Sequence, residues 1–138
     1  MKGTIIDAHI EGDTFYVTKH TKYGTFKGKV TLCDEDKDVK SEIDGYSFAE
    51  RKCDLQALKV KADFFKQRAI GVQHAYKVMK HSGIDLNDPI AQKLKRQVKV
   101  AWDNYNYHLE VYKINKENYY PNIERLLNYR RMIRKTNE

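Results

Sequence analysis

Cysteine is scarce in this chain: its 138 residues include two, Cys33 and Cys53, and no Cys-x-x-Cys pair. Two such thiols favour reduced side chains in a cytoplasmic setting, and a single disulfide between them is the alternative. Long apolar runs are also missing, because no stretch approaches the ~20 apolar residues that a membrane-spanning helix needs. The residues after Met1 begin strand-like, without the apolar region of a secretory leader. Together these absences predict a cytoplasmic protein.

The chain also lacks the short motifs that mark common catalytic sites. It has no His-Glu-x-x-His, no glycine-rich phosphate loop and no nucleophile elbow. His74 and His81 are two helical turns apart, which is too far for one metal ion without a third element. Cys53 falls in the first turns of a predicted helix, where the dipole lowers a thiol pKa, but no histidine lies near it in sequence. We therefore predict a protein without catalytic residues, bound metal or cofactor.

The first third of the chain has the pattern of a small antiparallel sheet. Two β-prone segments, residues 4–8 and 14–18, flank a turn signal at residues 11–13. A second turn at residues 22–24 precedes a period-2 segment with one apolar face, formed by Phe26, Gly28, Val30 and Leu32. Three short strands leave two free edges and need an element packed on them. A polar connection over residues 33–46 is expected to lead to that element.

Two long helices are predicted after this connection. Ser47 and Glu50 form a capping box, so the first helix is expected to begin at Ser47 and to stop at Gly83. Asp88 and Pro89 are the N-cap and first residue expected of the second helix. Each helix carries a heptad seam: Leu55, Leu58, Ala62, Phe65, Ala69, Val72, Tyr76 and Met79 in the first, and Ala91, Leu94, Val98, Ala101, Tyr105, His108 and Tyr112 in the second.

These patterns predict an α+β fold in a single domain of residues 1–138. A β-rich part, residues 1–46, would pack on a helical part, residues 47–138. Seams joined by a short loop pack antiparallel, so the helices should form a long hairpin with Phe65 and Val98 buried in it. Pro121 is expected to break the second helix and to open a short C-terminal helix.

Positive charge is concentrated in the helical part. Residues 1–46 contain 7 Lys/Arg and 9 Asp/Glu, a net charge of −2, whereas residues 47–138 contain 19 and 10, a net charge of +9. A localised positive field attracts nucleic acid, nucleotides or an acidic protein face. A well-solvated lysine-rich helix surface is the alternative.

Tyrosine density gives the first candidate binding residues. Five of the ten tyrosines fall between residues 105 and 120, among lysines and arginines. Tyr105 and Tyr112 lie in the seam and are expected in the core. Tyrosine rings and hydroxyls beside cations suit nucleotide or single-strand binding, and equally a protein interface. The predicted ligand- or partner-binding residues of this group are Tyr107, Tyr119, Tyr120, Lys95 and Lys99.

A basic cluster near the end of the chain gives the others: Arg130, Arg131 and Arg134. Arg130 and Arg134 are one helical turn apart, so both guanidinium groups can face one anion. The alternative is that they complement the last carbonyls of a helix and its dipole. Both interpretations remain open from the sequence.

Three segments carry a resemblance to a known group of proteins: Tyr23–Val30 (Tyr-Gly-Thr-Phe-Lys-Gly-Lys-Val), the acidic run 35–38 with Ser41-Glu42, and Gly45–Arg51 (Gly-Tyr-Ser-Phe-Ala-Glu-Arg). This part resembles small accessory proteins of phages and prophages of low-GC Gram-positive bacteria. The resemblance implies an accessory role in infection, such as blocking a host defence protein or sequestering its signal. It brings no catalytic residues.

We accordingly expect a non-catalytic phage accessory protein acting in the host cytoplasm. Its expected partner is an anionic small ligand of nucleotide type or a host defence protein, and the alternative is a nucleic-acid-binding accessory or regulatory protein. Trp102 and Leu109, apolar residues beside the second seam, leave surface for a further helix, so a homo-oligomer is also predicted.

Overall fold

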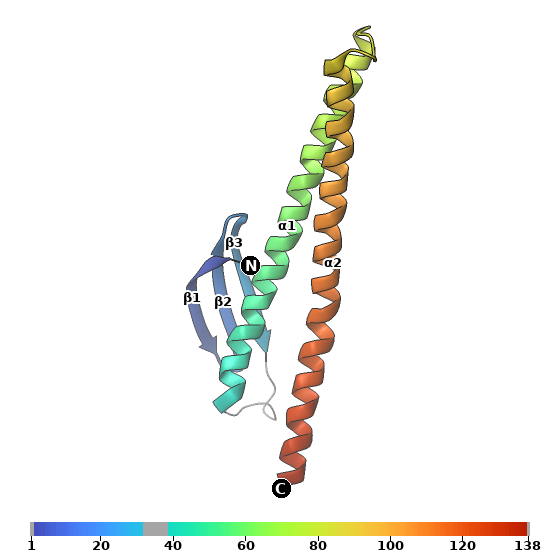
Figure 1. Cartoon of the computed structure of the whole chain (residues 1–138). Coiled ribbons are helices and arrows are strands. Elements are labelled where there is room, and N and C mark those ends of the chain that lie inside the picture. The colour runs from blue at the N-terminus through green and yellow to red at the C-terminus, as the bar shows by residue number, and fades with distance from the viewer. Residues whose placement is uncertain (1, 32–38, 138) are drawn as a thin grey trace. The chain divides into compact units, whose positions relative to one another are not determined.

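A computed structural model describes residues 2–31 and 39–137, with side chains over residues 2–31 and 45–119 (Figure 1). Its elements are β1 (Gly3–Glu11), β2 (Thr14–Thr21), β3 (Gly24–Thr31), α1 (Val39–His81) and α2 (Pro89–Asn137). The predicted α+β class is confirmed. The chain divides into two compact units. The sheet unit comprises Met1–Ala57 with Lys113–Glu138, and the hairpin unit comprises Leu58–Tyr112.

The sheet is antiparallel, as predicted, and its strands are arranged in the order β1-β2-β3. Both predicted turns are present, and Gly12 (φ 59°) and Gly24 (φ 133°) take backbone conformations that side chains disfavour. The register shifts between Ile5 and Asp7, where β1 carries a bulge. Because β1 is an edge strand, this bulge interrupts the regular backbone ladder that another strand would need for pairing.

One face of the sheet packs on the N-terminal part of α1 (Figure 1). Val17 of β2, with Ala49 and Cys53 of α1, forms a buried cluster against which Phe26 and Val30 pack. The approach is close at Gly28 of β3, where an added Cβ would lie 2.1 Å from the Ala49 carbonyl oxygen and 3.2 Å from the Cys53 sulfur. The small residues at this contact therefore let helix and strand backbones meet directly.

An ion-pair cluster also joins sheet and helix. The Lys19 side chain is almost fully buried, and its ammonium lies 2.9 Å from Glu50 Oε1 and 2.8 Å from Asp54 Oδ1. Burial acts to lower the pKa of Lys19, but the hydrogen bonds to Asp54 and Glu50 outweigh it and leave this pKa raised. The ammonium is thereby kept charged although the Lys19 side chain is only 4% exposed.

The start of α1 corrects one expectation from the sequence. The helix begins at Val39, so residues 39–46 are helical and Ser47 lies inside the helix rather than at its cap. The backbone at Gly45 approaches the Phe15 ring, where an added Cβ would lie 2.5 Å from it, and Tyr46 packs edge-on to that ring at 5.1 Å. This packing on the sheet supports helical turns that local capping signals do not predict.

Cys53 is consequently not at a helix N-terminus. Its sulfur is buried and donates toward the carbonyl oxygens of Val17 and Phe26, both at 3.4 Å. Burial, and then the charge of Asp54, raises the thiol pKa. The expected lowering by the helix dipole is wrong, and Cys53 behaves as a packing residue. It is a free cysteine, and Cys33 lies outside the described residues.

The end of α2 corrects a second expectation. Helix α2 continues through Pro121 to Asn137, so no separate C-terminal helix follows a break. A proline removes one backbone hydrogen bond and is disfavoured in a helix interior, but it does not by itself end the helix. Tyr119, two residues earlier, is buried and donates a hydrogen bond of 2.9 Å to the Phe48 carbonyl oxygen. This contact fixes α2 against α1 beside the proline.

In the hairpin unit, α1 and α2 run antiparallel and the predicted caps are confirmed. Helix α1 ends before Gly83 (φ 82°), and Asp88 Oδ1 accepts a hydrogen bond of 2.9 Å from the Ile90 amide at the start of α2. The connection also contains an Asx turn, in which Asp85 Oδ1 accepts from the Asn87 amide at 3.0 Å. The short predicted loop therefore turns the chain as expected.

The hairpin seam is buried mainly at its alanines: Ala62, Ala69, Ala91 and Ala101. Phe65 and Val98, expected to be buried, are half-buried, because close packing at the alanines leaves the larger residues at the margins of the seam. Trp102 is also half-buried and donates its indole N–H to Gln73 Oε1 at 3.1 Å. It thus links the two helices rather than standing free for a third one.

His108 makes the stability of the hairpin unit dependent on pH. Its imidazole stacks on the Phe65 ring at 4.2 Å, and burial, followed by the nearby charge of Lys61, lowers its pKa below 6.5. When folding lowers the pKa of a basic group, the folded protein loses stability as the pH falls through the pKa that this group has in the unfolded chain. We therefore expect the urea midpoint to decline from about pH 6.5 downward. A His108→Phe variant should flatten that decline, whereas an unchanged profile would contradict the assignment.

Candidate anion-binding groove of the helical hairpin

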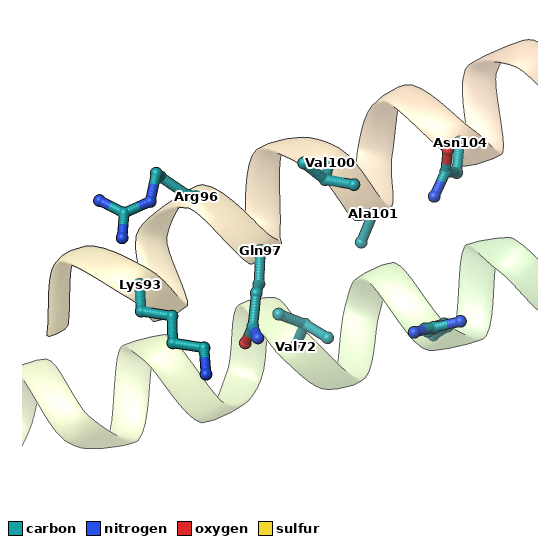
Figure 2. Close-up of a pocket in the computed structure, with 8 residues that line it drawn as sticks. Val72, Lys93, Arg96, Gln97, Val100, Ala101 and Asn104 are labelled. Carbon is teal, nitrogen blue, oxygen red and sulfur yellow. The ribbon is translucent and has the colours of Figure 1, made fainter. Parts of the chain in front are cut away.

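A shallow groove of about 340 Å³ lies on the surface of the hairpin unit (Figure 2). Two of its lining residues come from α1 and six from α2: Arg68, Val72, Lys93, Arg96, Gln97, Val100, Ala101 and Asn104. Figure 2 shows Lys93 and Gln97 extending from α2 toward α1, and Val72 extending from α1 toward α2. The groove thus follows the line along which the two helices meet.

Helical spacing explains why these side chains converge. On α2, Lys93, Gln97, Val100 and Asn104 follow one another at intervals of four, three and four residues, so they share one face. On α1, Arg68 and Val72 are four residues apart and also share a face. The side chains line one groove because these two faces lie next to each other where the helices meet.

The groove is strongly cationic. Arg68, Lys93 and Arg96 are exposed, and none of the ion pairs among the residues with described side chains involves them. The helical segments 64–81 and 89–104 contain eight Lys/Arg and one Asp/Glu, Asp103, which does not line the groove. The loop between these segments contains two acidic residues, Asp85 and Asp88, whose carboxylates accept hydrogen bonds from backbone amides. Three uncompensated cations within about three helical turns form a local positive field.

The floor of the groove is apolar. Ala101 is buried, Val72 is half-buried and Val100 remains 56% exposed. The amides of Gln97 and Asn104 add hydrogen-bonding groups beside this floor. The site therefore combines cationic groups, amides and an apolar strip, and can bind an anion that also carries apolar surface.

The sequence-predicted binding residues have different placements. Lys95 and Lys99 are exposed but do not line the groove. Tyr107 is 65% exposed, and its ring meets the edge of His108 at 5.1 Å. Tyr119 is buried and holds the Phe48 carbonyl, so its expected exposure to a ligand is wrong. The remaining predicted residues have side chains outside the described ones: Tyr120, Arg130, Arg131 and Arg134.

Sequence reasoning missed Arg68, Lys93 and Arg96. The signal was available in part, because Lys93 shares a helical face with Val100 and Asn104 whereas Lys95 and Lys99 fall on another. Arg68 could not be added from spacing alone, since the register between the two helices brings it to the groove. Cation density in the sequence pointed to Lys95 and Lys99 of α2, whereas the residues of α2 that line the groove include Lys93 and Arg96.

The described residues contain no group of three metal-ligating side chains and no helix long and apolar enough to cross a membrane. Comparison with protein-family models, with curated proteins and with solved structures found no match. The groove is therefore interpreted from its own chemistry.

Proposed function

We propose that this chain is a non-catalytic binding protein whose helical hairpin engages an anionic partner through the groove. The observation that carries the proposal is the set of three exposed cations, Arg68, Lys93 and Arg96, none of them in an ion pair among the described side chains. Uncompensated like charges repel one another, and an anionic partner relieves that repulsion on binding.

The resemblance to phage accessory proteins supports a biological setting for this binding. We propose an action in the host cytoplasm that counters a defence system, by sequestering a nucleotide-type signal or by occluding a host protein. Both partners offer the negative charge that the groove would attract. Expression of the protein should restore plaque formation on a host whose defence it blocks, and the Arg68→Glu/Lys93→Glu variant should not restore it.

A nucleic-acid-binding accessory protein is the alternative. Its support is the net charge of the helical part, but the groove residues from Lys93 to Asn104 span only ~16 Å along α2 at 1.5 Å per residue. A phosphate-tracking protein requires a longer charged path and gives a log–log salt slope near −0.9 per duplex phosphate contact. We expect a shallower slope, and nanomolar duplex binding at ~150 mM salt would favour the alternative.

Charge reversal tests the groove directly. We expect Arg68→Glu/Lys93→Glu to weaken binding of ATP or poly-L-glutamate by about tenfold or more, because two favourable contacts become repulsive. Calorimetry with each probe measures this change. A matched control, Lys66→Glu/Lys99→Glu, reverses an equal number of positive charges on the same two helices, at exposed positions outside the groove. Equal loss in both variants would show that only net charge matters.

Self-association is a further expectation of the proposed function. The sequence-based prediction of a homo-oligomer rested partly on Trp102, which instead donates a hydrogen bond to Gln73 of the same chain. Other apolar side chains are available on β1, where Ile5, Ile6 and Ile10 are between 39% and 60% exposed. Exposed apolar surface of this kind favours contact with another protein molecule. We expect light scattering at micromolar concentration to report a homo-oligomer, and a clean monomer would exclude it.

A further inference from the structure

We infer that the groove binds an acidic amphipathic helix of a partner protein. This inference rests on the proposed function and deepens it by choosing a protein helix over a free nucleotide or a nucleic-acid strand. Helix-in-groove recognition needs an apolar strip for one face of the incoming helix, with complementary charge beside that strip. The hairpin unit supplies both.

The apolar floor distinguishes a helix from a simple anion. A phosphate group gains from cations and amides but gains nothing from valine, whereas Val100 leaves 56% of its surface in water beside Val72 and Ala101. Leucine-type side chains at intervals of three and four residues on an incoming helix would cover this surface. The floor therefore favours a partner with an apolar stripe of its own.

Exposed aromatic rings extend this floor. Phe65 and His108 stack across the hairpin, and outside them Phe64 meets Phe65 at 5.6 Å while Tyr107 meets His108 at 5.1 Å. Phe64 lies one helical turn from Arg68, and Tyr107 one turn from Asn104. The two outer rings are 57% and 65% exposed. A helix bound in the groove would therefore also cover the apolar rings of Phe64 and Tyr107, which lie beyond the end of the groove.

The positive charge of the groove requires a negatively charged partner. Arg68 stands on α1, and Lys93 and Arg96 stand on α2, so cations rise from both helices beside the apolar floor. Glutamates on both flanks of an amphipathic helix would meet them. A second copy of this chain would instead place the same three cations opposite themselves, and like charges at an interface oppose association. The occupant is therefore an acidic helix from another protein.

A designed peptide provides the probe. The peptide has about fifteen residues, enough to span the ~16 Å groove, with leucines on one face and glutamates on both flanks. A scrambled peptide has the same composition without the apolar face. We expect the full-length protein to bind the amphipathic peptide at least tenfold more tightly than the scrambled one in fluorescence anisotropy. Equal affinity for both peptides would overturn the inference.

The Val100→Lys variant separates helix docking from anion binding. Val100 is exposed, so the substitution should leave the helical melting curve intact while it adds a cation and removes part of the floor. Helix docking predicts at least fivefold weaker peptide binding by Val100→Lys, with ATP binding unchanged or stronger. Stronger binding of the peptide itself would show recognition of charge alone and would overturn the inference.

Binding measurements with competing ligands distinguish an error in the helix-docking inference from an error in the proposed function. If ATP or a single-stranded dT oligonucleotide binds through Arg68 and Lys93 and displaces a weaker peptide, the inference is wrong and the proposed groove function stands. If Arg68→Glu/Lys93→Glu binds every probe as the unmodified protein does, both are wrong. Loss of peptide binding in this variant, with retention by Lys66→Glu/Lys99→Glu, supports both.

Discussion

Replacing Gly28 by alanine is expected to lower the free energy of unfolding by about 3 kcal/mol. The new methyl group would lie 2.1 Å from the Ala49 carbonyl oxygen, a backbone atom that cannot rotate away. Helix α1 would have to move off β3, which would open the contact around Cys53 and Val17. Chemical denaturation followed by circular dichroism measures the loss.

Gly71 supplies the matched control for this substitution. It lies inside α1 with no atom within 4 Å of an added Cβ. Gly71→Ala should therefore stabilise the protein by about 0.5–1 kcal/mol through helix propensity. Opposite signs for the same chemical change would assign the Gly28 effect to close packing. Similar effects at the two positions would contradict the described contact between β3 and α1.

Replacing Lys19 by methionine is expected to cost about 2–3 kcal/mol. The substitution keeps the apolar stem but leaves the carboxylates of Glu50 and Asp54 beside each other without the cation between them. These carboxylates keep 36% and 24% of their side chains exposed, so water solvates them in part and holds the cost below that of a fully buried pair. Urea unfolding at neutral pH measures the difference.

Removing the charges as a set distinguishes an ion-pair effect from lost packing. The triple variant Lys19→Met/Glu50→Gln/Asp54→Asn removes both carboxylate charges together with the cation and should recover most of the loss. In the unmodified protein, the raised pKa of Lys19 implies stability that is complete below pH 10.5 and declines as pH rises through the folded value. A triple variant no more stable than Lys19→Met would contradict the electrostatic explanation.

Local signals in the sequence predicted the sheet and the helix ends around the hairpin loop. Turn glycines Gly12 and Gly24 mark the strands, and Gly83 and Asp88 mark the caps, because each of these positions is determined by its own backbone geometry. The capping box at Ser47 was misleading, since Gly45 and Tyr46 pack on Phe15 and extend the helix toward its N-terminus. That contact joins segments thirty residues apart, and local patterns do not report it.

The site was predicted less completely than the fold. Composition located excess positive charge in the helices, and Tyr107 is 65% exposed. Tyr119 was misjudged because its hydroxyl partner, the Phe48 carbonyl, comes from a distant part of the chain. Arg68 was missed for the same kind of reason, since only the register of the two helices brings it into one groove with Asn104 and Val100.

Amide chemical shifts of the full-length, ¹⁵N-labelled protein test the central claim, anion binding in the hairpin groove, most directly. Sodium tripolyphosphate and the acidic amphipathic peptide would be titrated separately at ~150 mM salt. Saturable shifts should cluster at Arg68, Val72 and residues 93–104, and Arg68→Glu/Lys93→Glu should abolish them. Shifts centred on the sheet, or no saturable shift with either probe, would contradict the account.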